Sequence, residues 1–479
     1  MNNFIKNIFD AGTIKIAILC ILIALPLGFF FAKGGLISVL IALIIILALI
    51  YLVYAFKYPK IPLKTAFIVS FFAIGLTRYV GGPFGLTIDI LIVLSWISLL
   101  VNRWNKMDFS KANSLINLFP VIWFSYIILE LFNPQTLSAE AWFYAMRAIA
   151  LYMFLIFPLC FLLFNSKADL KWMIKIWLLI SVLAAIKGIT QKMGYLDPFD
   201  KAWLNQGDNM RTHVLFGQLR VFSFYSDAGQ FGAAMAHAAL FSMIMIAEPN
   251  KFMVKMMYLA LAILFFYAYL ISGTRGAFAV IGAGIITYLI LSKNFKTLII
   301  GVVLIGSAYY LLAFTNVGQN NYDIRRLRTA FVQGSDEASF QVRIQNQKKL
   351  KAYLVDKPFG GGIGTAGDWG RRFSPDSFLA HFETDSLYVR IWAETGVVGL
   401  TIYLLFFFYI LVKGGLILWK IKDPQYRTKL IALYCGVVGI MAASYGNSVL
   451  TQFPSAIVCY FSIAIIFISE KLWYKASSK

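Results

Sequence analysis

The sequence predicts an all-α membrane protein with about fourteen transmembrane helices and a large, partly helical outer loop. Its 479 residues are 60% hydrophobic and only 14% charged, whereas a soluble domain carries roughly 25% charged residues. Apolar runs of roughly 20 residues, each long enough to cross a bilayer as a helix, recur along the whole chain. The runs are continuous and do not alternate with polar residues, so we expect helices and not a β-barrel.

The apolar runs divide the chain into four parts: N-terminal helices in 1–190, an outer loop with further helices in 191–314, a cap loop in 315–393 and C-terminal helices in 394–479. The first run has no convincing cleavage site of small residues, so we interpret it as an uncleaved helix. Helices are expected at 14–32, 35–56, 63–79, 83–102, 116–132, 142–164, 170–190, 229–247, 252–272, 274–292, 296–314, 394–414, 428–446 and 449–470.

The basic residues predict an orientation in the membrane. The formal net charge is +21, and lysines and arginines gather in alternate connections such as "KYPKIPLK" and "KIKDPQYRTK". Cytoplasmic loops carry such an excess, so both termini are expected in the cytoplasm and the connections 191–228 and 315–393 in the periplasm. The excess charge therefore does not indicate a nucleic-acid partner. All four cysteines lie inside apolar runs, without the spacing of a disulfide framework or a metal site.

Several charged residues lie inside the expected helices, where each costs on the order of 2.5–3.5 kcal/mol at the bilayer centre. With this orientation, they all fall in the outer third of their helices. Each one could extend its charge to the membrane interface, but a shared polar cavity that opens outward explains the whole set more simply. The set consists of Arg78, Asp89, Glu130, Arg147 and Lys187.

Further charged residues, Arg220, Asp227 and Arg275, are expected at the outer entrances of helices. Arg275 belongs to "SGTRGAF", a short turn between two helices in which flanking glycines would hold the guanidinium at a fixed depth. An arginine presents a planar fork of donors that suits phosphate oxygens. We therefore interpret this turn as a candidate anion site, although Arg275 could equally mark the membrane interface.

The cap loop contains a glycine run, "KPFGGGIGTAG", at 357–367. No Gly-Lys-Ser/Thr follows it and no strand–helix unit surrounds it, which excludes a Walker loop and a dinucleotide fingerprint. Glycines also permit tight turns and close backbone approach, so the run can serve either packing or a ligand.

Titratable residues crowd the stretch "HFETDSLYVRIWAETGVVGL" that leads from the cap into the membrane. Asp385 and its neighbours Thr384 and Ser386 are good residues to begin a helix. His381 and Glu383 are not needed for that purpose. A histidine beside carboxylates can act as a general base toward a hydroxyl, which makes this stretch a candidate catalytic site.

Three segments, "ISGTRGAFAVIGAG", "RIQNQKKLKAYLVDKPFGGGIGTAG" and "TDSLYVRIWAETGVVGL", together resemble the O-antigen ligase and polymerase superfamily. Its members are bacterial inner-membrane glycosyltransferases that use undecaprenyl-diphosphate-linked sugars. "RVFSFYSDAGQFG" is a weaker match through Arg220. The resemblance covers roughly the last 260 residues and depends on the order and topology of the motifs.

The resemblance implies that Arg220, Arg275 and Arg343 hold the donor diphosphate while an acceptor hydroxyl of a glycan, lipid or protein attacks the anomeric carbon with inversion. No cofactor is implied, and no essential metal is expected because the outer loops lack an Asp-x-Asp pair. Ligases of the family commonly place a histidine nine residues before the glutamate that corresponds to Glu394, and Asp385 stands at that position here.

Several alternatives stay open at this point. The general base is either Asp385, which stands at the position of the family's histidine, or His381, whose ordinary pKa suits a base near neutral pH. Glu383 is a third candidate. The substitution at position 385 favours a polymerase, or a transferase to another acceptor, over a ligase that acts on lipid A-core. A transferase of glycans to protein hydroxyls is a further possibility. A flippase for lipid-linked glycans is less favoured, because no internal repeat is evident and the polar residues cluster toward one face.

Overall fold

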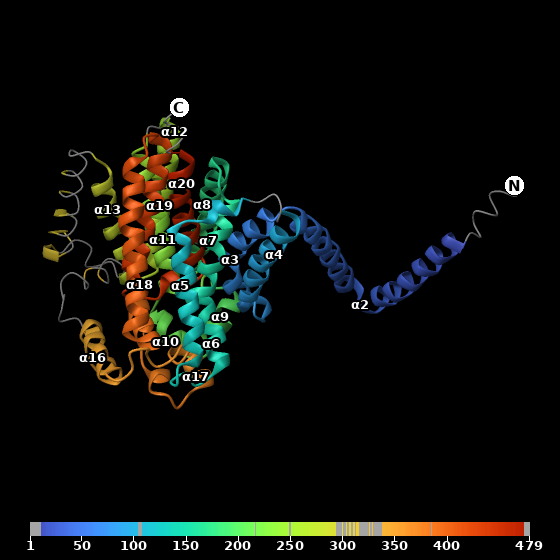
Figure 1. Ribbon diagram of the computed structural model, residues 1–479, viewed down its shortest axis with the longest axis horizontal. Coiled ribbons are helices and arrows are strands. Elements are labelled where there is room, and N and C mark those ends of the chain that lie inside the picture. Colours follow the sequence, from blue (N-terminus) through green and yellow to red (C-terminus); the bar gives the residue numbers. More distant parts are fainter. Residues whose placement is uncertain are drawn as a thin grey trace.

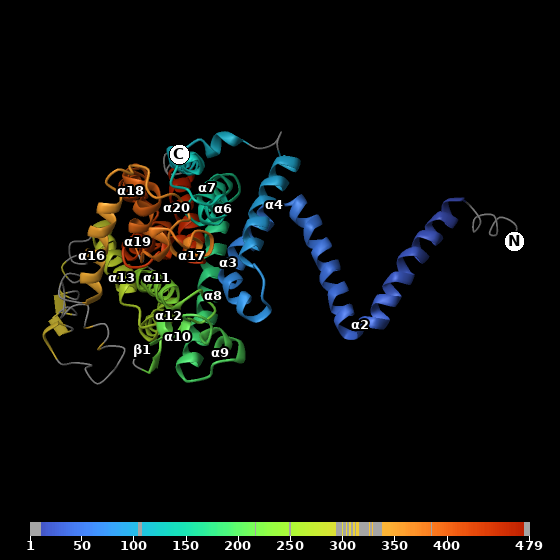
Figure 2. The same cartoon turned by 90° about the horizontal axis from the view of Figure 1, so that it is seen from below.

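The computed structural model describes residues 11–103, 108–215, 217–248, 251–293, 338–384 and 386–473, together with scattered positions between 299 and 328. Most of the helices run side by side in one bundle, and α2 projects away from it (Figures 1 and 2). We refer to the connection 191–228 as the central loop. Its short helices and the cap helices lie at the same end of the bundle (Figure 1).

The helices of the apolar runs are α2 (Ala11–Lys57), α3 (Lys60–Val80), α4 (Gly85–Arg103), α5 (Leu115–Leu129), α6 (Ala139–Met146), α7 (Tyr152–Leu163), α8 (Lys167–Lys192), α11 (Ala228–Ile246), α12 (Phe252–Ile271), α13 (Phe278–Leu291), α18 (Leu387–Lys420), α19 (Pro424–Ala443) and α20 (Ser455–Trp473). The other elements are η2 (Phe109–Ala112), η3 (Glu130–Phe132), η4 (Arg147–Leu151), α9 (Pro198–Leu204), α10 (Asn209–His213), β1 (Val214–Leu215), β2 (Gln218–Leu219), η5 (Arg275–Ala277), α16 (Ala338–Tyr353), α17 (Gly367–Phe373), η7 (Phe378–His381) and η8 (Val449–Thr451).

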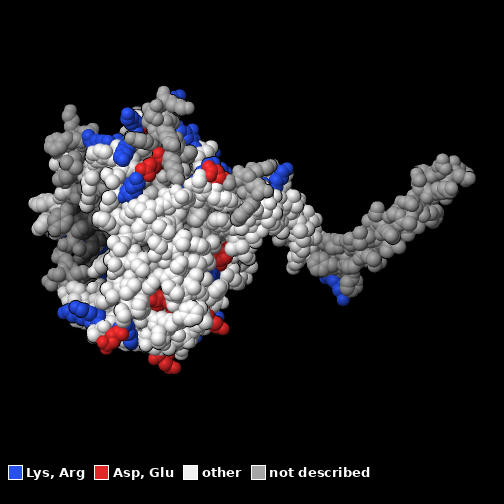
Figure 3. All heavy atoms as spheres, viewed as in Figure 1, with Lys and Arg blue, Asp and Glu red and all other residues white. Residues whose placement is uncertain are grey.

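The expected class of helical, multi-pass membrane protein is confirmed. Within the described residues, ten helices are long and apolar enough to cross a membrane, and two shorter apolar helices accompany them. The expected helices 14–32 and 35–56 both belong to α2, which bends at Gly35. Most of the expected helix 296–314 lies outside the described residues, so the number fourteen stays a prediction. On the face drawn in Figure 3, charged residues gather toward the two ends and leave a largely uncharged band between them.

The centre of the bundle is α11, of which 89% is buried within the protein. Small residues allow helix backbones to approach closely in a membrane. Gly232 of α11 faces Ser272 and Thr274, since a Cβ built at Gly232 would lie 2.4 Å from the Ser272 hydroxyl. His237, in the middle of α11, packs against Trp177 with ring centroids 4.6 Å apart, which makes it a core residue. Helix α11 therefore holds the other helices, and the turns at their ends, in fixed relative positions.

The cap closes one end of the bundle through its own small hydrophobic cluster. Leu350 of α16 and Leu354, which follows this helix, pack with Ala366, Leu379 and Phe382, and the cluster reaches Ala393 in α18. The helical part expected in this loop is present as α16. Because one face of this cluster belongs to α18, the cap is attached to a membrane helix and is not tethered by its ends alone.

The glycine run of the cap lies directly on a kink of α18. A Cβ at Gly396, where φ is +66°, would lie 2.0 Å from the carbonyl oxygen of Pro358. The amides of Gly361 and Gly362 donate to the carbonyls of Ala393 and Glu394 at 2.8 and 3.1 Å. Only residues without a side chain permit this approach, so the run serves packing between cap and membrane helix.

Candidate functional site

The turn between α12 and α13 holds Arg275 in a fixed place. The Thr274 amide donates to the Ser272 hydroxyl at 3.2 Å, and the Thr274 hydroxyl donates to the carbonyl of Ala228, the first residue of α11, at 2.8 Å. Gly273 has φ of +59°, a conformation that glycine adopts without strain. Arg275 begins the short helix η5 and is half-buried. The turn is therefore tied to the central helix immediately before the arginine.

Arg220 lies beside this turn. It follows the β1–β2 hairpin, in which Val214 pairs with Leu219, and its own amide donates to the carbonyl of His213 at 2.7 Å. Its guanidinium donates to the carbonyl of Thr212 at 3.0 Å and to the hydroxyl of Thr274 at 3.3 Å. Arg220 therefore contacts the turn of Arg275, although the two arginines are far apart in the sequence.

Arg343 reaches the same place from the cap helix α16. Its guanidinium donates to the carbonyl of Gly446 at 3.4 Å. Gly446 in turn lies against the turn of Arg275, because a Cβ built at Gly446 would be 3.8 Å from the Cα of Gly276. Residues 444–448, which connect α19 to η8, thus lie between the cap helix α16 and the turn of Arg275. We refer to them as the 444–448 turn.

The beginning of α18 is attached to the same turn. The amide of Leu387 donates to the carbonyl of Ser444 at 3.0 Å, and the Tyr388 hydroxyl donates to the carbonyl of Met441 at 2.7 Å. Ser386 caps the helix by accepting from the amide of Val389. Asp385 lies outside the described residues. The Leu387 amide nevertheless attaches the start of α18 to the turn that Arg343 contacts.

The other two candidates for the base lie on the outside of the cap. His381 is exposed, and its Nε2 is 2.7 Å from the carbonyl oxygen of Pro375. Glu383 is also exposed. The contacts described here connect neither residue to the 444–448 turn. Glu394 differs, because it is buried and accepts from Arg390 and from the Ala366 amide, each at 3.3 Å, and so helps to hold the cap.

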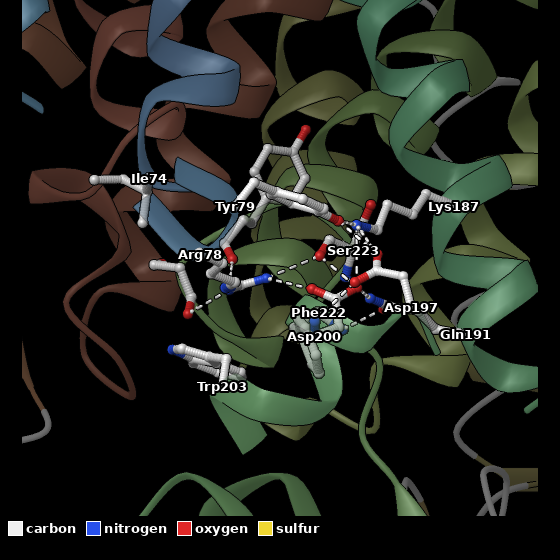
Figure 4. Close-up of polar contacts among 12 residues, drawn as sticks. Ile74, Arg78, Tyr79, Lys187, Gln191, Asp197, Asp200, Trp203, Phe222 and Ser223 are labelled. Atoms are coloured by element: carbon white, nitrogen blue, oxygen red, sulfur yellow. Dashed lines mark hydrogen bonds and ion pairs between the residues drawn. The ribbon is translucent and has the colours of Figure 1, made fainter. Parts of the chain in front are cut away.

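A buried network of charges holds the segment that leads to Arg220. Arg78 of α3 forms an ion pair with Asp200 at 3.5 Å, and the two side chains are 2% and 0% exposed. The same guanidinium donates to the carbonyls of Ser223 and Ser226 at 3.1 Å and lies over the ring of Trp203 (Figure 4). Arg78 therefore fixes the backbone between Arg220 and the start of α11.

Lysine and tyrosine side chains complete this network. Lys187 of α8 lies 3.0 Å from Asp200 and 3.3 Å from Asp197, and Tyr79 donates to Asp197 at 2.6 Å (Figure 4). Burial opposes the ionisation of Asp197. Hydrogen bonds from Tyr79 and the Asp200 amide, together with the charge of Lys187, outweigh burial and bring the pKa of Asp197 to about 2. The carboxylate therefore stays charged and anchors the loop at neutral pH.

The expectation of one polar cavity shared by the five charged membrane residues is not met among the described residues. Arg78 and Lys187 pair with the loop carboxylates, Arg147 pairs with Asp89, and Glu130 accepts from Asn133 at 2.8 Å. Each of these charged side chains has at least one partner, because a buried charge without one is costly. The outer loops supply some of these partners, and the depth of a charged residue in its helix does not reveal them.

Sequence reasoning missed two contributors to the site, Thr274 and Asn447, whereas it had named Asp227 among the charged residues at helix entrances. Asp227 caps α11 by accepting from the Gln230 amide at 3.0 Å. The Asn447 side chain lies close to Gly229, the second residue of that helix. The available signal was "SYGNS" at 444–448, a polar run between two apolar runs, which marks an outer turn crowded with hydrogen-bonding groups.

The arrangement can bind an anion near a hydroxyl-bearing substrate. Arg220, the turn of Arg275 and the 444–448 turn that Arg343 contacts lie near the capped N-terminus of α11, which adds the favourable end of a helix dipole. Among the described residues, no group of three or more His, Cys, Asp or Glu side chains could hold a metal ion. Fold and site together define a multi-pass helical membrane protein whose membrane helices and cap converge on an arginine-rich turn.

Comparison with known families agrees with this class. Residues 259–404 match the family described as O-antigen ligase. The resemblance to the superfamily of O-antigen ligases and polymerases, membrane enzymes of glycosyl transfer, is thereby confirmed, and the matched segment includes Arg275, Arg343 and the beginning of α18. No curated protein matches the chain.

Proposed function

We propose that this protein transfers a glycan from an undecaprenyl-diphosphate-linked donor to an acceptor hydroxyl at the cap end of the bundle. The observation that carries the proposal is a chain of contacts among three arginines: Arg220 donates to Thr274 in the turn of Arg275, and that turn lies beside Gly446, whose carbonyl accepts from Arg343. They come from the central loop, a membrane turn and the cap, so only the folded protein brings them together. Arginines are suited to a diphosphate because each can offer two parallel hydrogen bonds to its oxygens.

The chemistry needs a leaving group, a nucleophile and a proton acceptor. The acceptor oxygen forms a bond to the anomeric carbon while the bond from that carbon to the diphosphate breaks, with inversion. The hydroxyl proton passes to Asp385 or His381, with Glu383 as the third candidate. Undecaprenyl diphosphate leaves with the bonding electrons, and donors fixed in advance around its oxygens stabilise the growing charge. We propose no metal or cofactor in this step.

We propose the bacterial inner membrane as the location, with both termini in the cytoplasm and the site in the periplasm. The alternating basic connections support this orientation. A cysteine in place of Gln347 on α16 should react with an impermeant thiol reagent in intact spheroplasts. Labelling that requires permeabilised membranes would place the cap, and with it the site, on the other side.

The glycan profile of a deletion strain tests the activity. Short, single-unit glycans on the final carrier indicate lost polymerisation, whereas accumulated lipid-linked polymer indicates lost ligation. Loss of glycan from proteins alone would indicate a protein glycan transferase. Lipid-linked glycan that stays on the cytoplasmic side would indicate a flippase and contradict the proposal.

Complementation of that strain with Arg275→Lys tests the site itself. A lysine keeps the charge but not the fork, so glycan product should fall by about 10-fold or more, as expected when a hydrogen bond between charged groups worth roughly 1.5–3 kcal/mol is lost. Arg371→Lys provides the matched control, because Arg371 is exposed on α17 and pairs with Asp368 of the same helix. Full activity of Arg275→Ala at normal protein level would remove the proposed role.

A further inference from the structure

A groove of about 580 Å³ opens at the cap end of the bundle, next to the arginine site but separate from it. Its walls come from α3, α4, α6, η4, the cap helix α17 and the segment around η8. None of the three arginines assigned to the diphosphate lines it. The groove is large enough for several sugar rings or for part of a lipid chain.

Aromatic side chains form one side of the groove. Tyr144 of α6 and Trp369 of α17 are stacked with ring centroids 4.7 Å apart and an interplanar angle of 14°. On another part of the wall, Tyr152 lies against Phe453 with centroids 4.9 Å apart. Tyrosine and tryptophan combine an apolar ring with a polar atom, which suits ligands that have both apolar faces and hydroxyl groups. Sugar rings are ligands of this kind.

Polar groups without a partner lie among these rings. The Nε of Arg147 and the Oε1 of Gln452 are buried and have no hydrogen-bond partner in the described part of the chain. Arg147 begins the π-helical turn η4, a feature that is frequent at functional sites. A buried polar atom costs about 1–3 kcal/mol when nothing satisfies it. The Arg147 and Gln452 side chains themselves line the groove, so its wall favours a ligand with hydrogen-bonding groups over a hydrocarbon chain.

Arg372 adds an exposed cation at the side of the groove formed by α17. Its guanidinium lies 5.0 Å from the ring centroid of Phe373, and it forms no ion pair with the residues that the structure describes. The adjacent Arg371, by contrast, pairs with Asp368 and does not line the groove. The two neighbours thus differ in the way that a functional and a purely structural arginine would differ.

The groove and the arginine site come close to each other at two consecutive residues, Ser226 and Asp227. Ser226 lines the groove, and its hydroxyl donates to Asp227 at 2.8 Å. The other carboxylate oxygen of Asp227 lies beside Gly229, the position that the Asn447 side chain approaches from the 444–448 turn. The groove therefore ends next to Asp227, the residue that caps α11 beside the proposed diphosphate site.

We propose that this groove binds the glycan acceptor and presents its hydroxyl to the donor. The inference rests on the proposed function, since it identifies the second substrate of the same reaction as an oligosaccharide chain. Tyr144 and Trp369 contact the sugar faces, and Arg147, Gln452 and Arg372 bind its hydroxyl or acidic groups. The separation of the two sites explains how the protein holds two glycans at once without competition for the arginines.

Binding to the purified full chain in detergent tests this inference with two probes. The first is the lipid-linked glycan of a deletion strain, released from its lipid diphosphate by mild acid and labelled with a fluorophore. The second is undecaprenyl diphosphate without sugar. Arg372→Gln and Trp369→Ala should each weaken binding of the released glycan by at least 10-fold and leave binding of undecaprenyl diphosphate unchanged. Arg275→Ala should show the reverse pattern.

Matched variants keep the outcome decisive. Arg371→Gln should bind both probes as the wild type does, and Trp369→Phe should retain most glycan binding because it preserves the stack on Tyr144. If Trp369→Ala lowers the thermal stability, the exposed Arg372→Gln decides alone. Unchanged glycan binding in Arg372→Gln overturns the inference. Loss of undecaprenyl diphosphate binding in the groove variants also overturns it, because the groove would then hold the lipid carrier.

Failure of the proposed function would give a different pattern. A wild-type protein that binds the released glycan through the groove but does not bind undecaprenyl diphosphate would contradict the arginine site alone. The groove would still be a glycan site in that case. Absence of glycan binding in the wild type, with undecaprenyl diphosphate bound normally, would contradict only the groove.

Discussion

The guanidinium of Arg220 donates a hydrogen bond to the hydroxyl of Thr274 at 3.3 Å, and Thr274 immediately precedes Arg275. The same hydroxyl donates to the carbonyl of Ala228 at 2.8 Å, so one buried side chain connects two arginines to the start of the central helix. Thr274 touches no reacting atom in the proposed mechanism. It acts as a positioning residue for Arg220.

Replacement of Thr274 should therefore impair the arginine site without unfolding the protein. Thr274→Val removes the oxygen that accepts from Arg220, a hydrogen bond to a charged group worth roughly 1.5–3 kcal/mol. Glycan product in a complemented deletion strain should fall by about 10-fold or more. Thr274→Ser keeps the hydroxyl and should retain activity. Equal activity of Thr274→Val and Thr274→Ser would show that the contact does not matter.

The ion pair of Arg78 and Asp200 should contribute to stability more than exposed pairs do. Arg78→Met leaves the buried Asp200 with Lys187 at 3.0 Å and removes the donors to the loop carbonyls. Breaking a buried pair costs about 3–5 kcal/mol, and the remaining lysine places the expected loss near the lower value. Thermal unfolding in detergent, followed with the level of membrane protein, measures this loss.

The pair of Lys413 and Glu470 provides the control for Arg78. Their side chains are 35% and 38% exposed and 2.6 Å apart, so Lys413→Met should cost less than about 1 kcal/mol. If the two variants unfold at the same temperature, the buried network does not hold the loop as described.

Much of the fold could be predicted because the bilayer leaves the chain few choices. An apolar run near Ala228 must form a helix in lipid, and α11 begins within one residue of the expected start. The kink of α18 at Gly396 was not predicted, because it depends on the approach of Pro358 from the cap. The hydrophobic periodicity and the composition of a sequence describe one segment at a time. They do not show which distant segment packs against it.

The candidate site, like the fold, could be predicted only in part. The arginines were predicted individually, from the turn of Arg275 and from the resemblance, but their contacts with distant segments, such as that of Arg343 with Gly446 more than one hundred residues away, could not be predicted. The sequence also did not show which residues pair with the charged residues of the membrane helices. Asp200 lies in a loop that the sequence marks only as long and polar, and its pairing with Arg78 follows from the packing of α9 near α3.

His213 should make the central loop sensitive to pH. Its Nε2 accepts from the Ala228 amide at 3.3 Å, which requires a neutral ring. Burial lowers the pKa of His213, and Arg220 and Arg78 act in the same direction, whereas Asp227 and the Asn209 carbonyl oppose them. The folded pKa is therefore below the ordinary value of about 6.5. The stabilising effect is complete above that value and is lost as pH falls below it.

Limited proteolysis of residues 193–227 between pH 7.5 and 5.5 measures this effect. Cleavage of the wild type should increase as the pH falls, with cleavage of an unrelated exposed peptide as the correction for protease activity. His213→Gln removes the titrating group and should flatten the dependence. A slope that is unchanged in His213→Gln would mean that another group controls the loop.

The identity of the base can be decided by two variants. Asp385 occupies the position of the family histidine, and the residues that follow it are bound to the 444–448 turn through the Leu387 amide. His381 is exposed, and its ring lies 2.7 Å from the Pro375 carbonyl on the cap. We therefore expect Asp385→Asn to abolish glycan product and His381→Ala to retain most of it. Asparagine begins a helix as well as aspartate does, so the loss would reflect charge or proton transfer and not folding.

Membrane protein levels, measured alongside the glycan profile, confirm that the loss does not come from misfolding. A dead His381→Ala with an active Asp385→Asn would reverse the assignment. Normal product from both variants would leave Glu383→Gln as the remaining test of a base in this segment.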